Sequence, residues 1–85
     1  MAFNKEVLLA EADSAGWTRV SSSNVAAVAY SGMGGGRLYV RFKNQSVYVY
    51  DQVPRGVYDG LIAAPSKGKY MHSIVKQNYY VEKLA

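Results

Sequence analysis

The sequence predicts an α+β domain: a three-stranded antiparallel β-meander with two C-terminal helices packed on one face, plus an N-terminal helix. Three observations predict this class. Apolar residues recur at helical spacing near the N-terminus, two central segments alternate strictly between apolar and polar residues, and helical spacing returns after Pro54. The chain has 85 residues, of which 49% are hydrophobic, and this suits one domain with one modest core.

Residues 3–15 are expected to form the first helix, because their apolar side chains lie mostly along one face. Asn4 is a candidate N-cap and Gly16 a candidate stop. The polar, serine-rich stretch 18–24 is typical of a loop or linker. The expected organisation is an N-terminal helix and linker at 1–23, a compact domain at 24–80 and a tail at 81–85.

The central part of the chain is expected to supply the strands. The strands are expected at 25–30, 37–43 and 46–51. The second and third alternate strictly, as half-buried strands do, and the tight Asn44-Gln45 turn between them predicts a β-hairpin. The glycine-rich turn at 32–36 requires a positive φ at one or more of its glycines.

Two short helices are expected after the strands. Pro54 suits the first turn of a helix at 54–63, which Pro65 ends. Ser66 is a candidate N-cap for a second helix at about 66–77. The remaining tail is expected to be a short strand or an extended segment.

Several short motifs follow one another in a characteristic order. They are Ser23–Tyr30, Leu38–Phe42, Val47–Tyr50, Val53-Pro54, Val57-Tyr58, Leu61 and Ser66–Tyr70. In this order and spacing, the segment from Ser22 to Tyr79 resembles the KTSC domain, a short bacterial and phage module also found at the C-terminus of some lysyl-tRNA synthetases. The resemblance implies the same fold, and it suggests RNA binding.

Two features depart from the family pattern. The hairpin turn is Asn44-Gln45 where family members tend to carry glycine, and the N-terminal helix lies outside the family region.

The hairpin is expected to separate two kinds of side chain, because successive strand residues point to opposite faces. One face would be aliphatic and would meet the two C-terminal helices. It comprises Leu38, Val40, Phe42, Val47 and Val49. The other face would mix phenol rings with cations, and Tyr30 would extend it in the right register. It comprises Arg37, Tyr39, Arg41, Lys43, Ser46, Tyr48 and Tyr50.

Such a mixed face suits unpaired nucleic acid, because aromatic rings stack on bases and cations contact phosphates. The predicted binding residues on it are Arg37, Tyr39, Arg41, Tyr48 and Tyr50. Two alternatives stay open. The N-terminal helix and Trp17 could cover this face as a second core, or two copies of the chain could meet there, because tyrosine and arginine are favoured at interfaces.

A second candidate site lies at the start of the last helix. Ser66 would cap the helix, Gly68 would allow close approach, and Lys67 and Lys69 would add charge for an anion or phosphate. His72, further along the same helix, could hydrogen-bond a base or phosphate there. The alternative is an ordinary cap with solvated lysines, although cations at a helix N-terminus oppose the helix dipole.

The composition argues against enzymatic chemistry. The chain has no cysteine, one histidine and no paired acids, so neither a catalytic constellation, a metal site nor a cofactor is expected. With no long apolar run and no signal-peptide pattern, a cytoplasmic protein is expected, in the host cytoplasm if a phage encodes it.

The net charge of +4 favours an anionic partner, so we expect a small non-enzymatic module that binds RNA or single-stranded nucleic acid. One alternative is a phage or bacterial accessory or anti-defence protein that binds a host protein or sequesters a small nucleotide. Another is a homo-oligomeric structural protein.

Overall fold

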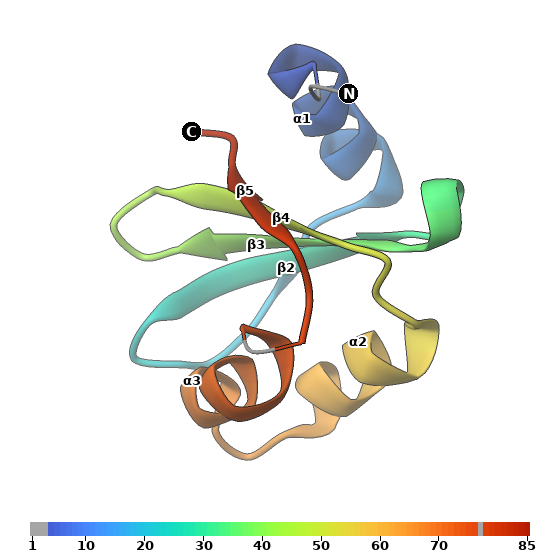
Figure 1. Ribbon diagram of the computed structural model, residues 1–85. Helices are drawn as coiled ribbons and strands as arrows, with labels where there is room; N and C mark the ends of the chain where they lie inside the picture. Colours follow the sequence, from blue (N-terminus) through green and yellow to red (C-terminus); the bar gives the residue numbers. More distant parts are fainter. Residues whose placement is uncertain (1–3, 77) are drawn as a thin grey trace.

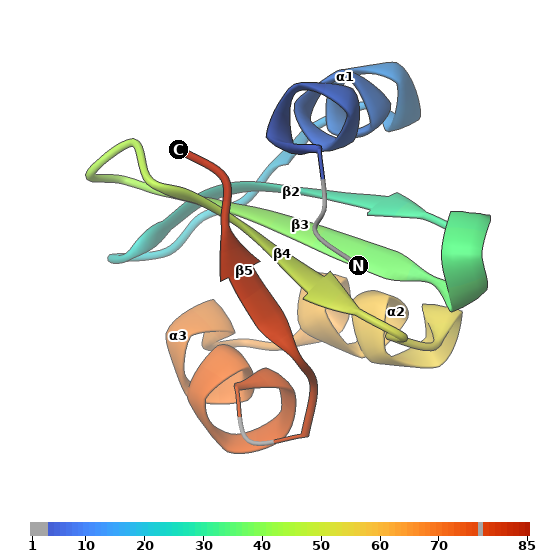
Figure 2. The same cartoon turned by 45° about the horizontal axis from the view of Figure 1, so that its top comes forward.

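The computed structural model describes residues 4–76 and 78–85, which form three layers (Figure 1). One helix, α1 (Lys5–Ala15), lies on one side of a β-sheet. Two helices, α2 (Arg55–Ala63) and α3 (Lys67–Tyr70), lie on the other side, and α3 continues as a π-helical turn at Met71–Val75. The rotated view in Figure 2 shows the same layering, with the sheet between α1 and the two later helices.

The sheet has five antiparallel strands in chain order. They are β1 (Thr18–Arg19), β2 (Val25–Ser31), β3 (Arg37–Phe42), β4 (Val47–Asp51) and β5 (Val81–Lys83). A short 3₁₀ turn, Met33–Gly35, joins β2 to β3. The α+β class is confirmed, but the three-stranded meander is wrong, because β1 and β5 pair with the outer edges of β2 and β4. β1 lies in the stretch that was expected to be a loop, whereas β5 agrees with the short strand or extended segment expected for the tail.

The helix ends follow the predicted caps. The Asn4 side chain accepts a hydrogen bond from the backbone N–H of Val7, and Gly16 ends α1 with a φ of 93°. The Ser66 hydroxyl accepts from the backbone N–H of Lys69, so it caps α3. Positions 3 and 77, included in the predicted helices, lie outside the described residues.

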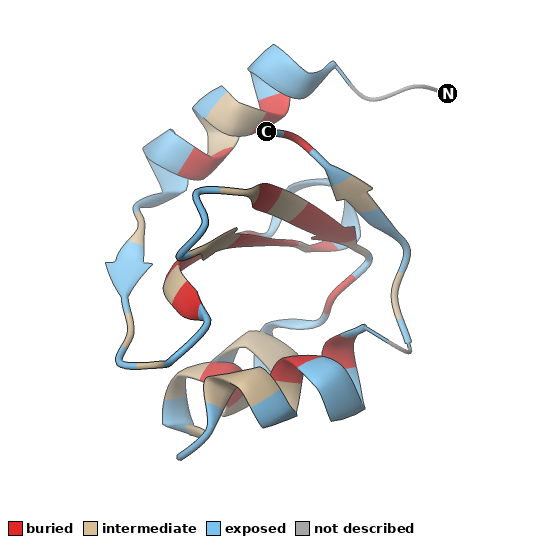
Figure 3. Cartoon of the chain, turned by 90° about the vertical axis from the view of Figure 1, so that its left-hand side faces the viewer, coloured by how far each residue is buried: buried red, intermediate tan, exposed pale blue. Residues whose placement is uncertain are grey.

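The three layers enclose two hydrophobic cores, one on each face of the sheet (Figure 3). Buried residues of the core beside α2 and α3 are Val25, Val28, Leu38, Val40, Tyr50, Val53, Leu61, Met71 and Val75. Buried residues of the core beside α1 are Leu8, Ala12, Ala29, Tyr39, Val47, Val49 and Leu84. The N-terminal helix therefore packs on the sheet and completes its second core.

The β3–β4 hairpin turns through three residues, 43–45, and not through the predicted two-residue turn. The backbone N–H of Gln45 donates to the carbonyl of Phe42, and the N–H of Phe42 donates to the carbonyl of Ser46, both at 2.9 Å. Gln45 has a φ of 72°, the left-handed conformation that closes a three-residue hairpin loop after a type I turn.

The additional turn residue shifts the pairing by one position and moves every β4 side chain to the opposite face. Tyr39 lies opposite Val49, and Tyr48 lies opposite Val40. Directly paired residues share a face, so the prediction that Tyr39, Tyr48 and Tyr50 share one face is wrong.

Each face of the hairpin therefore combines residues from both predicted sets. The face toward α2 and α3 carries Leu38, Val40, Phe42, Tyr48 and Tyr50, and Tyr30 joins it from β2. The face toward α1 carries Arg37, Tyr39, Arg41, Val47 and Val49. Val47 and Val49 consequently meet α1 and not the C-terminal helices.

Candidate functional site

The α1 face of β3 is held by Glu11, which projects from the middle of α1. Arg37 Nη1 donates to both Glu11 carboxylate oxygens, at 3.0 and 2.9 Å, and the two side chains are about one-fifth exposed. The Tyr39 hydroxyl donates to the same carboxylate, and Tyr39 is fully buried. The hydrogen bond to Glu11 raises the pKa of Arg37, while burial, followed by the Glu11 hydrogen bond, raises the pKa of Tyr39.

Arg41 is also engaged by the N-terminal segment. Its guanidinium carbon lies 4.5 Å from the centroid of a Trp17 ring, in cation–π geometry. Trp17 meets Tyr39 edge-on, with ring centroids 6.5 Å apart, and donates through Nε1 to Asp13 at 2.8 Å. Three of the five predicted sheet-face residues therefore lie beneath α1 and its following turn, as the helix-covered alternative expects.

The predicted anion site at the start of α3 is also partly occupied by the chain itself. Lys67 Nζ donates to the carbonyl oxygens of Ile62 and Ala64, at 2.9 and 2.5 Å, so this lysine caps the end of α2. This arrangement removes its charge from the N-terminus of α3, where the dipole would disfavour it. Lys69 and His72 remain exposed.

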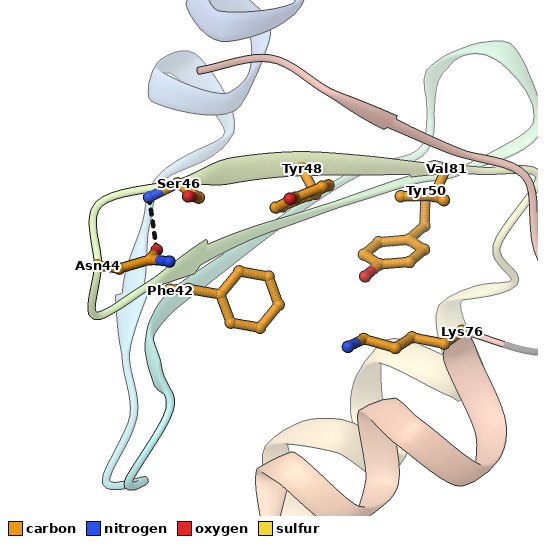
Figure 4. A pocket seen from close by; sticks show the side chains of 7 residues that line it. All are labelled: Phe42, Asn44, Ser46, Tyr48, Tyr50, Lys76 and Val81. Carbon is orange, nitrogen blue, oxygen red and sulfur yellow. Dashed lines mark hydrogen bonds between the residues drawn. The ribbon is translucent and has the colours of Figure 1, made fainter.

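A groove opens on the other face, between the β3–β4 hairpin and the end of α3 (Figure 4). Its volume is about 470 Å³. The hairpin supplies Phe42, Asn44, Ser46, Tyr48 and Tyr50, and Lys76 and Val81 complete the lining. Figure 4 shows Lys76, at the end of the π-helical turn, lying below the Tyr50 ring with its ammonium directed toward the Phe42 ring.

The aromatic wall of the groove is ordered by contacts within it. Phe42 and Tyr48 meet edge to face, with centroids 5.6 Å apart, and Lys76 Nζ lies 5.8 Å from the Phe42 ring centroid. Asn44 Oδ1 accepts the backbone N–H of Ser46 at 3.0 Å, which fixes the amide at the rim. The groove thus presents ring surface, a cation and an oriented amide together.

The groove continues into a second hollow of about 290 Å³, which is lined by Ser23, Asn24 and Lys43 together with Phe42, Asn44 and Lys76 of the groove. Positive charge dominates here, because the lining includes two lysines, Lys43 and Lys76, and no acidic side chain. We call the two adjoining hollows the hairpin groove.

The residues that line the hairpin groove were only partly among those predicted from the sequence. Tyr48 and Tyr50 were predicted as binding residues, but on an open face shared with Tyr39. Phe42 was assigned to the aliphatic face, and counting the turn as three residues would have placed it beside Tyr48. No local pattern could have indicated Lys76, which comes from a distant helix.

Alkaline pH is expected to destabilise the fold through its two buried phenols. Burial raises the pKa of Tyr50 to about 12 and also raises that of Tyr39. Phenols of the unfolded chain titrate near pH 10. Above that pH the native state therefore holds more protons than the unfolded state, and rising pH favours unfolding. Each phenol contributes up to about 1.4 kcal/mol per pH unit.

Urea unfolding measured from about pH 9 to about pH 12 tests this linkage. Tyr39→Phe and Tyr50→Phe should each flatten the decline in unfolding free energy. The exposed-phenol control Tyr80→Phe should not. A stability that stays constant through this range in the wild-type protein would contradict the expectation.

Among the described residues, no cluster of histidine, cysteine and carboxylate side chains could hold a metal ion. None of the helices within 4–76 and 78–85 is both long and apolar enough to cross a membrane.

Comparisons with known proteins agree with this architecture. A family model described as the KTSC domain matches residues 21–79. Segments of 48 residues are 42% and 40% identical to parts of lysine–tRNA ligases from Trichormus variabilis and a Nostoc species, covering 56% of this chain but 9% of each ligase. The crystal structure of a KTSC domain protein from Yersinia pestis superposes with a TM-score of 0.76 at 26% identity. The superposition covers 81% of this chain and 96% of that one.

Proposed function

This chain belongs to the KTSC domain family, and from that premise we propose that it is a small non-enzymatic module that binds single-stranded RNA in the hairpin groove. The observation that carries the proposal is the pairing of an aromatic wall, Phe42 and Tyr48, with Lys76 in an open hollow. Bases stack on such rings, and ammonium groups neutralise the phosphates between them.

The extent of the hairpin groove favours a strand over a single nucleotide. The hollow beside Lys43 adjoins the one beside Tyr48, so neighbouring nucleotides would each find a separate space. Lys83 on β5 lies opposite Tyr48 and adds a further cation on the same side of the sheet. The two matched lysine–tRNA ligases act on an RNA by name, which is consistent with an RNA ligand here.

Reversing the charge of Lys43 and Lys76 together is expected to weaken RNA binding by roughly tenfold or more, because two phosphate contacts would become repulsive. The measurement is fluorescence anisotropy with labelled single-stranded RNA of about ten nucleotides at about 50 mM salt, where electrostatic binding is strong. Wild-type affinity should also fall as salt is added.

A matched variant, Lys5→Glu with Arg19→Glu, changes the net charge equally but leaves the hairpin groove intact. Both control positions are exposed, on α1 and β1. It should lose much less affinity. Equal losses in the two double variants would assign binding to overall charge and contradict the groove. Absence of any binding by the wild-type protein would contradict the proposed function itself.

A further inference from the structure

Tyr50 is a buried phenol whose hydroxyl faces the hairpin groove. The residue is 2% exposed and its ring belongs to the core beside α2 and α3. Figure 4 shows the hydroxyl directed into the space between Phe42 and Lys76. It forms no hydrogen bond to any residue within 4–76 or 78–85, whereas the Tyr30 hydroxyl donates to the carbonyl oxygen of Val53. A buried polar group usually has a partner, and here the groove is where one can approach.

Lys76 is a second group at this place without an acceptor in the protein. Its ammonium lies 5.8 Å from the Phe42 ring centroid, and it forms neither an ion pair nor a hydrogen bond with the part of the chain that the structure describes. An ammonium group can only donate hydrogen bonds, whereas a phenol can donate or accept. A ligand group that satisfies Lys76 must therefore bring acceptors, and one with several acceptors can satisfy the Tyr50 hydroxyl as well.

A backbone phosphate of the bound strand meets this requirement. It combines a negative charge with several acceptor oxygens, and tyrosine hydroxyls are among the groups that contact phosphates in nucleic-acid complexes. The two hollows of the hairpin groove share Lys76 in their linings. A strand that places one nucleotide in each hollow therefore brings the phosphate between them past Lys76.

We infer that the Tyr50 hydroxyl and the Lys76 ammonium together hold one phosphate of the bound RNA, so that the hairpin groove recognises the backbone of an unpaired strand and not its base sequence. The inference rests on the proposed RNA-binding function, and it assigns Tyr50 a phosphate contact in place of the base stacking expected from the sequence. Burial raises the pKa of Tyr50 to about 12, so the phenol is uncharged at neutral pH and can donate to an anion. Phe42 and Tyr48 supply the stacking surface, which accepts any base.

The test measures the binding of labelled oligouridine and oligocytidine, each of about ten nucleotides, by fluorescence anisotropy at neutral pH and about 50 mM salt. Tyr50→Phe should weaken the binding of both by the same factor, roughly tenfold, because it removes one hydrogen bond to a charged group. The control Tyr80→Phe removes an exposed hydroxyl from the chain leading into β5 and should leave both affinities unchanged. A loss confined to one oligonucleotide would assign the hydroxyl to a base and overturn the inference.

A double-mutant cycle with Lys76→Gln tests whether the two groups hold the same phosphate. If they do, Tyr50→Phe should cost much less affinity in the Lys76→Gln background than in the wild type, because groups that share a partner are coupled. Lys76→Gln should also lower the slope of log affinity against log salt by about 0.7, the value for one phosphate contact on a single strand. Tyr50→Phe keeps the net charge and should leave that slope unchanged. Losses that simply multiply would contradict a shared phosphate.

Tyr50→Phe is expected to fold, because the hydroxyl it removes has no partner among the described residues. Its melting temperature, measured by circular dichroism, should match or exceed that of the wild type. Unchanged affinity of this variant for both oligonucleotides would overturn the inference and leave RNA binding standing. Failure of the wild-type protein to bind either oligonucleotide would overturn the proposed function and the inference together.

Discussion

Replacing Glu11 with alanine is expected to lower the free energy of unfolding by roughly 2–4 kcal/mol. The carboxylate accepts hydrogen bonds from Arg37 and from the fully buried Tyr39. Its removal would leave a buried phenol and a mostly buried guanidinium without their main acceptor. The ion pair is about one-fifth exposed, so solvent compensates for part of the loss, which places the cost below that of a fully buried pair.

Urea unfolding at neutral pH measures this cost, and Glu6→Ala is the matched control. Glu6 lies on the same helix and is exposed, so its replacement should cost only a few tenths of a kcal/mol through the helix dipole. Glu11→Gln keeps an acceptor without the charge and should fall between the two. If Glu11→Ala cost no more than Glu6→Ala, the anchoring of α1 through this carboxylate would be refuted.

The register of the β3–β4 hairpin explains why the prediction that Tyr39, Tyr48 and Tyr50 share one face was wrong. The alternation of β3 and of β4 was read correctly from the sequence, and each strand does place neighbouring residues on opposite faces. The relative register of the two strands depends on one residue of the turn. Gln45 adopts the left-handed conformation at the position of a three-residue loop that glycine usually occupies. Because this chain has glutamine there, the sequence did not indicate a three-residue loop.

Secondary structure with local signals was predicted well. The caps at Asn4 and Ser66 and the proline at position 54 mark helix starts, and these signals act within a few residues. β1 and β5 have two and three residues, and they exist because neighbouring strands offer free edges. Such strands are set by tertiary structure, which a local pattern does not contain.

The hairpin groove was only partly predictable for the same reason. Tyr48 and Tyr50 are recognisable in the sequence as a Tyr-x-Tyr motif. Lys43 and Lys76 line the same hollow only because the last helical segment packs below the hairpin. The Ser66–Lys69 segment was likewise predicted only in part. Its cap is local and was predicted, whereas the use of Lys67 to cap α2 depends on how the two helices are arranged.

Gly36→Ala is expected to be the most damaging substitution of a single methyl group in the chain, with a loss of roughly 3–5 kcal/mol. Gly36 is buried and has a φ of 105°, which alanine rarely adopts. A methyl group there would overlap the carbonyl oxygen of Val53 and the hydroxyl of Tyr30. Those two atoms are hydrogen-bonded to each other at 2.6 Å, and the Val53 N–H donates to the Gly36 carbonyl at 2.9 Å.

The contact cannot relax locally, because Val53 leads from β4 into α2 and Tyr30 stacks on Tyr58 of that helix. A domain of this length has a total stability of about 4–13 kcal/mol, so the loss removes a large part of it and should lower the melting temperature by roughly 10–40 °C. Circular dichroism melting measures this, with Gly32→Ala as the matched control. Gly32 has a φ of −75° and open space around its Cβ position, so that variant should melt within a few degrees of the wild type. A Gly36→Ala protein that melts together with Gly32→Ala would show that the β2–β3 turn does not need glycine where it meets Val53.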